Sequence, residues 1–348
     1  MSTKATAVVA ASAAATTTTI LFHQTKPKFR YLSAWFCPYA HRATIALEYH
    51  KAHIDYEWVE ALGWYQKERT NTNKNTTTTS NSKGNIDSND DGNDDVDDDT
   101  EWYYHWKADE LKRVNPSALV PTLIPITTIV NEQHQTEEIV EESKAVYESL
   151  VTIDYIDMVA NNYRIASIAE TNRRTTCPSL VPYNDPYEYA RCRIWVDKVN
   201  RECCSPYYDI LVRQDPTERR LYFQKLLNGI QSFMNELKKT SGPTFLSDEQ
   251  VCNVDIAFFP WAYRFYVLQH YCGSEFVIPP NDPMYTPYHT WYQYMLQLDY
   301  VQRTLPDLEQ YLDHIQKYAN GTARSKVANA VRRGVAAHEL DDVQDEYK

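Results

Sequence analysis

Two patterns of apolar and polar residues divide this chain. Near the N-terminus, short β-rich runs at Phe29–Ser33 and Ile54–Val59 flank a stretch from Cys37 to about His50 that is typical of a helix. A strand, a helix and a second strand in this order predict a parallel strand pair joined by a right-handed crossover.

Further elements of the same kind follow a long polar segment. We expect a short helix from Trp102 to about Val114, and apolar residues at three-residue steps predict another helix after Tyr147. The elements expected here are a β-rich run at 122–130, a short strand at 145–147 and the second helix at 149–158. The predicted order is therefore β-α-β-α-β-β-α.

The second half of the chain carries helical signals only. In "DPYE" at Asp185–Glu188 and "DPTE" at Asp215–Glu218, Asp is a capping residue, Pro occupies the first helical position and Glu follows in the first turn. Two more helices are expected at about 253–269 and 288–298, whereas residues beyond Asn320 are polar and carry no clear signal.

These patterns predict an α/β domain followed by an all-helical domain. Between residues 66 and 100 the sequence consists mostly of Asn, Thr, Ser and Asp, which bury little apolar surface, so we interpret it as a solvated insert. The predicted divisions are a tail (1–26), the α/β domain with its insert (27–160), an irregular linker (161–184), the helical domain (185–318) and a second tail (319–348).

Charge and cysteine content narrow the functional class. The chain of 348 residues has a net charge of −12, and the run Asp87–Glu101 alone holds eight Asp and one Glu without a basic residue. An acidic protein lacks the basic face that nucleic acid requires. Seven scattered cysteines favour a reducing compartment over a disulfide scaffold. No stretch reaches the roughly 18 apolar residues that span a bilayer, so we expect no membrane partner.

The first residues allow two interpretations of location. Residues 1–28 contain no acidic residue, many Ala, Thr and Ser, and no apolar core of the kind found in secretory signals. We favour a disordered tail on a cytoplasmic protein. A plastid or mitochondrial address is the alternative.

Cys37 is the first candidate for chemistry. It stands at the start of the expected helix in "WFCPYAHR", where unpaired N–H groups and the helix dipole favour a thiolate. The alternative is a small, buried and inert apolar residue. Ala40 occupies the second position of a C-x-x-C pattern, so a reactive Cys37 would take its partner thiol from solution.

Two further stretches add candidates for ligand binding. Pro121 in "LVPTL" is either an ordinary trans proline at a strand start, which the local sequence favours, or a cis proline that turns the Val120 backbone toward a peptide. Glu148 and Ser149 stand at a strand-to-helix junction. They fit either a helix cap or a pair that holds the ammonium and carboxylate of an amino acid.

Together these stretches resemble a known family. "FCPYAHR", "NPSALVPTL", "VYESLVTIDYID", "NDPYEYARCRIW" and "CNVDIAFFPWAYRF" occur in the order seen in the cysteine-type glutathione S-transferases, and the chain is most similar to the omega and lambda classes. The resemblance spans roughly Phe29 to Leu312 apart from the insert. It implies a thioredoxin-like N-terminal domain followed by an all-α C-terminal domain.

The resemblance also implies roles for particular residues. The cysteine matching Cys37 forms a mixed disulfide with glutathione in this family, and Val120, before a cis Pro121, pairs with the cysteinyl backbone. The roles implied for the remaining positions are binding of the γ-glutamyl end by Glu148 and Ser149, binding of the glycyl carboxylate by Lys107, and lining of the acceptor site by Tyr187 and Arg264. A similar pair upstream, Glu142 and Ser143, is set aside, because Tyr155 and Asp157 match the family motif only from Glu148.

Two positions depart from the family pattern. His41 replaces the Gln or acid common in omega and lambda sequences, and "AHR" is similar to the glutathionyl-hydroquinone reductases. Cys252 stands where the family caps a buried helix with Ser or Thr. The first departure leaves the acceptor substrate open, and the second predicts a weaker helix cap.

Metal sites are not expected. Asp87–Asp98 begins like a calcium-binding EF-hand loop, but it ends in Asp instead of Glu and lies in a segment rich in Asp and Asn, where a chance match is favoured. Cys203 and Cys204 are adjacent and lack the spacing of metal ligands, so we interpret them as helix residues.

The expected function is a glutathione-dependent thiol transferase or reductase that acts through a disulfide between Cys37 and glutathione. It would reduce glutathionylated substrates, dehydroascorbate or related compounds, with weak glutathione conjugation as a side activity. Glutathione is the expected co-substrate, and the partner is a small electrophile or disulfide. The alternatives are a glutathionyl-hydroquinone reductase and a non-catalytic binding module of the same fold. Both a homodimer and a monomer are compatible with the resemblance.

Overall fold

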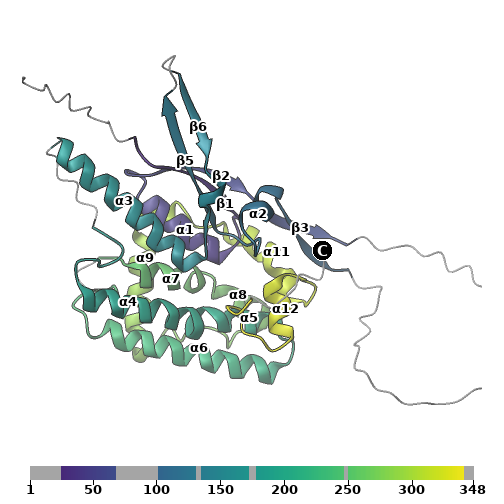
Figure 1. The fold of residues 1–348 in the computed structure, drawn as a ribbon. Helices are drawn as coiled ribbons and strands as arrows, with labels where there is room; N and C mark the ends of the chain where they lie inside the picture. The colour runs from purple at the N-terminus through teal and green to yellow at the C-terminus, as the bar shows by residue number, and fades with distance from the viewer. Residues whose placement is uncertain (1–24, 68–100, 131–134, 172–177, 247–249, 341–348) are drawn as a thin grey trace, which may run out of the picture.

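The computed structural model describes residues 25–67, 101–130, 135–171, 178–246 and 250–340. A sheet with two covering helices forms one side of the molecule, and the C-terminal helices form the other (Figure 1). The acidic run Asp87–Asp98 and most of the predicted N-terminal tail lie outside the described residues. Lys26, the last residue of that predicted tail, forms an ion pair with Asp55.

The main sheet begins with the predicted crossover. Strands β1 (Lys28–Ser33) and β2 (Asp55–Glu60) are parallel and are joined by helix α1 (Pro38–Tyr49). Strand β5 (Thr122–Val130) runs antiparallel to β1. It pairs near its start with β7 (Val146–Tyr147) and near its end with β6 (Thr136–Val140). The sheet order is β2-β1-β5-β6, and the β5–β6 hairpin projects away from the helices (Figure 1).

A second sheet occupies the place of an expected helix. Strand β3 (Leu62–Gln66) pairs antiparallel with β4 (Tyr103–Lys107), so these two strands form the base of the insert. The prediction of helix from Trp102 was therefore wrong, and α2 covers only Asp109–Val114. The aromatic residues of β4 favour a strand over a helix. The strand that pairs with it, β3, lies on the other side of the insert, so a local sequence pattern does not indicate the pairing.

Helix α3 (Ser149–Thr171) is much longer than predicted. The helix was expected to end at Met158 and an irregular linker to begin at Asn161, but the helix continues through half of that linker. Asp157 ties the helix to the rest of the connector, because its buried carboxylate accepts from the N–H groups of Leu180 and Val181 at 2.8 and 3.1 Å.

The helical domain contains the predicted helices and several more. Two of the predicted helices are capped by Asp185 and Asp215, whose carboxylates accept hydrogen bonds from N–H groups of the first turn. The helix expected at about 253–269 is interrupted after Ala262 and forms two helices. The described elements of this domain are α4 (Pro186–Val199), a π-helical turn (Asn200–Cys204), α5 (Ser205–Val212), α6 (Pro216–Leu237), α7 (Asn253–Ala262), α8 (Tyr266–Cys272), α9 (Thr286–Gln297), α10 (Asp299–Gln302), α11 (Leu308–Ala319) and α12 (Lys326–Arg332).

The segment after residue 319 is structured, which corrects the prediction of a C-terminal tail. Ala323, Ala328 and Val331 are fully buried. The Tyr103 N–H donates to the Thr322 carbonyl at 3.0 Å, which joins this segment to β4. Small buried residues such as Ala carry little periodic signal, so the sequence pattern understated this element.

Helix α1 joins the two halves of the molecule, because it packs against both α3 and α7. Ala40, Ala43 and Ala46 are fully buried and allow this close approach. Within the described residues, no helix has both the length and the apolar character needed to cross a membrane.

Candidate active site

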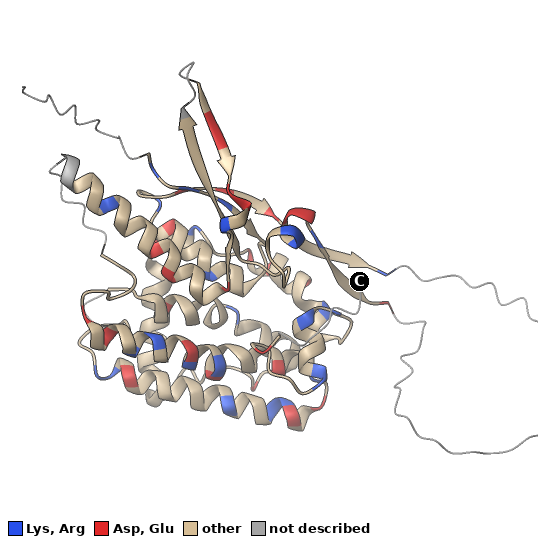
Figure 2. Ribbon diagram, in the orientation of Figure 1, with Lys and Arg blue, Asp and Glu red and all other residues tan. Residues whose placement is uncertain are grey.

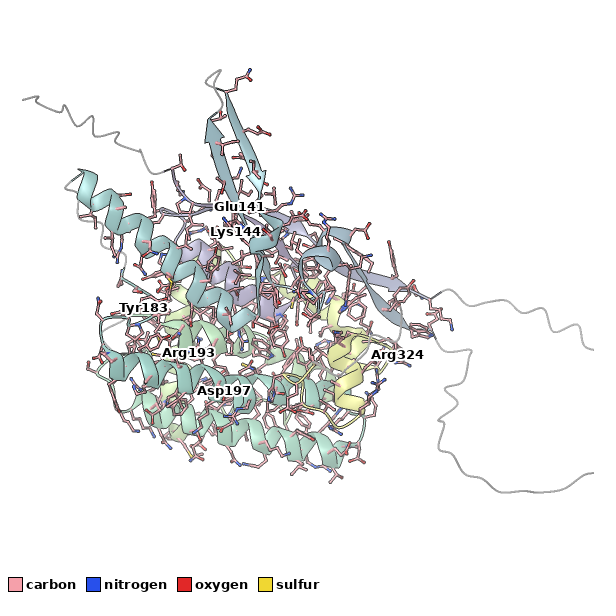
Figure 3. The ribbon with its side chains drawn as sticks, viewed as in Figure 1. Glu141, Lys144, Tyr183, Arg193, Asp197 and Arg324 are labelled. Atoms are coloured by element: carbon pink, nitrogen blue, oxygen red, sulfur yellow. The ribbon has the colours of Figure 1, made fainter. Side chains whose placement is uncertain are left out.

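A cavity of about 960 Å³ lies between the two domains at the start of α1. Six residues predicted from the sequence line it together, although they are spread over more than a hundred positions. They are Cys37, Lys107, Val120, Pro121, Glu148 and Ser149. Across the cavity, α4 contributes Arg193 and Asp197 (Figure 3).

Cys37 is the N-cap of α1 and remains partly exposed to the cavity. Pro38 occupies the first helical position. Burial raises the pKa of the Cys37 thiol above its usual value, while the N–H groups of Ala40 and Tyr39 act in the opposite direction. The expected net lowering of the pKa by the helix N-terminus was therefore wrong for the ligand-free protein, because loss of hydration outweighs the helix terminus.

The peptide bond between Val120 and Pro121 is cis. The trans form favoured by the local sequence was therefore wrong, and the geometry implied by the family resemblance is confirmed. Both residues line the cavity on the same side as Leu119 and Ala118. Loop residues before β5 thus present backbone to the cavity, and Asn115 supports them by donating from its side chain to the Leu119 carbonyl at 2.9 Å.

Glu148 and Ser149 meet the cavity at the start of α3. Glu148 has a φ of 72°, in the left-handed region that Glu seldom adopts, and such conformations concentrate at functional sites. The Ser149 hydroxyl is buried and accepts a hydrogen bond from Arg42 Nη1 at 2.9 Å. A hydroxyl at the N-terminus of a long helix is suited to an anion.

The upstream pair Glu142 and Ser143 does not line this cavity. The Glu142 carboxylate is bound by Arg113 at 2.6 Å in a short 3₁₀ turn, Glu142–Lys144. Figure 3 labels the adjacent Glu141 and Lys144 beside β6. Setting this pair aside on the sequence pattern is thus consistent with the geometry.

Arg42 is a cavity residue that the sequence analysis missed. It is only 1% exposed and stacks on Trp261, with the guanidinium carbon 4.2 Å from the ring centroid. The residue lies within the quoted motif "FCPYAHR", but nothing in the local spacing shows that its side chain turns toward α3 and α7 instead of solvent.

The two proposed acceptor-site residues do not lie in the cavity. Arg264 is fully buried, and its guanidinium donates to the Pro260 and Phe36 carbonyls at 2.7 and 3.5 Å. Tyr187 is 71% exposed in the first turn of α4. Neither residue is among those lining the cavity, so the structure does not bring them to the other site residues, and their roles stay predictions from the sequence.

Aromatic side chains form the wall near Cys37 instead. Phe36 stacks on His314 with ring centroids 4.0 Å apart, and Tyr39 lies parallel to Tyr208. The aromatic residues lining the cavity are Phe36, Tyr39, His105, Tyr208, Tyr311, His314, Tyr318 and His338. Burial lowers the pKa of His105 to about 3, and burial also lowers that of His314 well below its usual value. Both imidazoles are therefore neutral near pH 7.

The C-terminal segment closes the same side of the cavity. The Tyr39 hydroxyl donates to the Ala337 carbonyl at 2.9 Å, which anchors this segment at the start of α1. The segment contributes Ser325, Lys326, Val327, Ala337, His338 and Leu340 to the lining. These residues were not predicted, because residues 319–348 were expected to form a tail.

The side chains that line the cavity carry more positive than negative charge, whereas the whole protein is acidic. Along the outer helices α4 and α6, basic and acidic residues are interspersed (Figure 2). The cavity is lined by more cations than carboxylates, namely Arg42, Lys107, Lys112, Arg193 and Lys326 against Glu148 and Asp197. Since the chain carries a net charge of −12, a cationic cavity is a local feature suited to an anionic ligand.

Among the described residues, no cluster of three His, Cys, Asp or Glu side chains could hold a metal ion. Cys203 and Cys204 lie in the π-helical turn, which agrees with their interpretation as helix residues. Cys37 is the one cysteine that lines the cavity within the described part of the chain.

Comparison with solved structures identifies the architecture. Omega glutathione transferase 3C from Trametes versicolor matches with a TM-score of 0.54 and 20% identity, over 86% of this chain and 93% of that one. A Tau class enzyme from mango, Mangifera indica, matches with a TM-score of 0.55 and 20% identity, over 84% and 98%. The chain has the glutathione transferase fold.

Rice GST1, solved in complex with glutathione, also matches, with a TM-score of 0.55 and 17% identity over 85% of this chain and 98% of that one. No family model and no curated protein matches the sequence. In terms of the glutathione transferase fold, β1 to α3 form the thioredoxin-like domain and α4 to α12 form the helical domain. The cavity therefore lies between the two domains of the fold.

Proposed function

We propose that this protein is a glutathione-dependent thiol transferase or reductase that acts through Cys37. The observation that carries the proposal is that one cavity joins a partly exposed thiol, the backbone before a cis proline and the Glu148–Ser149 pair. The rice structure with the same fold binds glutathione, which supports the same ligand here.

Glutathione matches the chemistry of these groups end to end. Its sulfur would meet Cys37, and its cysteinyl backbone would pair with Val120 beside Pro121. At the γ-glutamyl end, Ser149 would donate to the carboxylate and Glu148 would bind the ammonium. Lys107, at the end of β4, would bind the glycyl carboxylate. The excess of cations in the cavity suits a ligand with two carboxylates and one ammonium.

The proposed cycle has two thiol–disulfide exchanges. The Cys37 thiolate attacks the glutathione sulfur of a glutathionylated substrate, so a disulfide to glutathione forms and the substrate leaves as a thiolate that takes up a proton. A second glutathione, as thiolate, attacks this disulfide and releases oxidised glutathione and the Cys37 thiolate. Because Cys37 is the one cysteine lining the cavity among the described residues, the second thiol comes from solution.

The acceptor would lie against the aromatic wall around Tyr39, Tyr208 and Tyr311. This wall accepts flat, apolar groups, so a glutathionyl-hydroquinone is an alternative substrate, and weak glutathione conjugation is compatible with it. Cytoplasmic location and homodimer formation stay predictions from the sequence.

One observation favours a second candidate, a non-catalytic module that binds glutathione. Burial raises the pKa of the Cys37 thiol, which lowers the thiolate fraction in the ligand-free protein. In the enzyme, binding of substrate would have to offset this effect.

Incubation with oxidised glutathione followed by intact mass measurement tests the proposal. We expect one glutathione adduct in the wild type, lost in Cys37→Ser and removed by added glutathione. Cys272→Ser is the matched control, since Cys272 is the other partly exposed cysteine of the described residues. A panel of a mixed disulfide, dehydroascorbate and a glutathionyl-hydroquinone then identifies the acceptor. An adduct absent from Cys37, with glutathione affinity kept in Cys37→Ser, would support the binding module instead.

A further inference from the structure

Basic side chains gather at the base of the insert. Lys67 and Trp102 stand on either side of residues 68–100, and the Lys67 N–H donates to the Trp102 carbonyl at 2.9 Å. Lys67 Nζ lies 5.1 Å from the centroid of the Trp102 ring, and the guanidinium carbon of Arg324 lies 6.0 Å from the same centroid. Lys317 Nζ lies 5.4 Å from the ring centroid of Tyr103, the next residue. Cations from two distant parts of the chain therefore meet where the insert joins β4.

Main-chain hydrogen bonds fix the C-terminal segment in this place. The Tyr103 N–H donates to the Thr322 carbonyl at 3.0 Å, and the Arg324 N–H donates to the Tyr103 carbonyl at 2.7 Å. Tyr103 and Ala323 form a parallel bridge. Figure 3 labels Arg324 near the strands at the base of the insert. The backbone position of Arg324 beside the insert is thus set by β4.

A further cation, Arg332, lies next to Arg324. Arg324 Nη1 donates to the carbonyls of Gly321 and Ala323 at 2.9 and 3.3 Å. Arg332 Nη2 donates to the same two carbonyls at 2.9 and 2.7 Å. The two guanidinium groups are therefore held side by side, where like charges repel each other. A carboxylate that contacts both groups would relieve this repulsion through charge-assisted hydrogen bonds.

The sequences on the two sides of this contact are opposite in charge. Between Asp313 and Glu339 the chain contains five Lys and Arg residues and no Asp or Glu. Residues 87–101 contain eight Asp and one Glu and no Lys or Arg. This acidic run ends directly before Trp102, the ring beside which Lys67 and Arg324 lie.

We propose that the basic cluster, defined as Lys67, Lys317, Arg324 and Arg332, binds the acidic run at residues 87–101 of the same chain. Charge complementarity favours this occupant, because the cluster is cationic and the run carries the highest density of carboxylates that adjoins it. The proposal concerns charge and position, so it does not depend on the proposed function.

The acidic run is also within reach of the cluster. Asp97, Asp98 and Asp99 precede Tyr103 by four to six residues, and Tyr103 is hydrogen-bonded to the segment that carries Arg324. An extended chain of this length spans up to about 13–22 Å, since each residue adds at most about 3.3–3.6 Å. The carboxylates can therefore contact the cluster without any change in β4.

Tethering favours this run over other acidic partners. Exposed ion pairs are individually weak, so a free acidic peptide or a second copy of the chain gains little from them. A short tether raises the effective concentration to the millimolar range. The acidic residues at 341–346 are the other candidate within the chain, but they follow Leu340, which lines the cavity, whereas residues 87–101 end at the cluster itself.

The contact would also act on one wall of the cavity. Ser325, Lys326 and Val327 line the cavity and lie between Arg324 and Arg332 in the sequence. Binding of the acidic run to these two arginines would therefore stabilise the backbone from which the three lining residues project.

Carbodiimide crosslinking, which joins a carboxylate directly to a lysine amine, tests the contact in the full-length protein. At low salt we expect a crosslink between the peptide that contains residues 87–101 and the peptide that contains Lys317, identified by mass spectrometry. NaCl at about 0.5 M should reduce its yield severalfold, because salt screens exposed charges. A mixture of ¹⁵N-labelled and unlabelled protein shows whether the link forms within one chain.

A double-mutant cycle then tests the role of the two arginines. The cluster variant carries Arg324→Gln and Arg332→Gln, and the insert variant carries Asp95→Asn, Asp97→Asn, Asp98→Asn and Asp99→Asn. The insert variant should lower the melting temperature by about 2 °C in the wild-type background. It should cause no further decrease in the cluster variant, because groups that interact are not additive.

A tail variant is the matched control, since it removes the same number of acidic charges through Asp341→Asn, Asp342→Asn, Asp345→Asn and Glu346→Gln. Its effect should be the same with and without the arginines. The proposal is overturned by the absence of the crosslink at low salt, by links between labelled and unlabelled chains alone, or by additive effects of the insert and cluster variants. Coupling of the tail variant to the cluster in place of the insert variant would overturn it as well. If the cluster variant does not fold, the crosslink in the wild-type protein still decides.

Discussion

His41 Nδ1 lies 3.1 Å from Arg264 Nη1, and the same guanidinium extends to the Phe36 carbonyl next to Cys37. On the other side of the ring, His41 Nε2 lies 2.8 Å from Thr304 Oγ1. Thr304 Oγ1 donates to the Val301 carbonyl, so the imidazole is neutral with its proton on Nε2. Burial lowers the pKa of His41 well below its usual value, which agrees with this assignment.

This arrangement predicts that His41 supports the site without selecting its substrate. His41→Gln keeps an acceptor for Arg264 and a donor for Thr304, so the ratio of rates with a mixed disulfide and a glutathionyl-hydroquinone should stay unchanged. His41→Leu removes both and should lower the melting temperature. Steady-state rates with both substrates and a thermal scan provide the measurements. A selective loss of the hydroquinone activity in His41→Gln would contradict the prediction and place His41 in substrate recognition.

The pH dependence of Cys37 alkylation provides a second test. Because burial raises the pKa of its thiol, the rate of modification by iodoacetamide in the ligand-free protein should still be rising at pH 9. The rate is followed by mass spectrometry of the Cys37 peptide between pH 6 and 10, with Cys37→Ser as the blank. A plateau reached below pH 8 would show that the helix N-terminus and the nearby guanidinium groups outweigh burial.

Ser149→Ala should weaken glutathione binding by about tenfold or more, because a charge-assisted hydrogen bond is lost and Arg42 keeps an unpaired donor. Ser143→Ala is the matched control, since Ser143 belongs to the similar upstream pair that lies outside the cavity. Titration calorimetry gives both affinities. Similar losses in the two variants would mean that the γ-glutamyl end binds elsewhere.

Cys252→Ser should raise the stability of the helical domain. Cys252 is the N-cap of α7, and its N–H donates to the Asp255 carboxylate at 2.9 Å. A serine hydroxyl accepts from helix N–H groups better than a thiol, which is worth about 1 kcal/mol. The melting temperature should therefore rise by roughly 2 °C. An unchanged or lower value in a calorimetric scan would count against a capping role for this position.

Stability should fall as the pH drops below neutrality, with His105 as one cause. The folded pKa of His105 is about 3, far below its ordinary 6.5, so the unfolded chain binds a proton that the folded protein does not. Below pH 6.5 the free energy of unfolding therefore falls by about 1.4 kcal/mol per pH unit, until the pKa of the folded state is reached. His105→Phe keeps a ring against Trp64 and should reduce the slope between pH 6.5 and 5 by up to this amount.

Urea unfolding at several pH values measures that slope in both proteins. Asp209 and Asp255 contribute with the opposite sign, because burial raises their pKa values to about 6. Their effect is common to wild type and variant and cancels in the comparison. Equal slopes in the two proteins would show that His105 is protonated in the folded state.

Local patterns were sufficient for much of the fold. The caps at Asp185 and Asp215, the helical stretch from Cys37 and the β-rich run at Phe29–Ser33 are short-range features, and the elements that they predicted are present. The hairpin of β3 and β4 was missed because its strands are separated by the insert, and the C-terminal segment was missed because its buried residues are mostly small.

By itself, the sequence determined most of the elements and their order, and its motifs, through the family resemblance, indicated Cys37, Lys107, Val120, Pro121, Glu148 and Ser149 as one site. Such features depend on neighbours a few residues away. The tertiary structure decided the direction of Arg42 and Arg264, the neutral state of the buried histidines and the raised pKa of Cys37. Those properties depend on burial and on charges supplied by distant parts of the chain, which no local pattern contains.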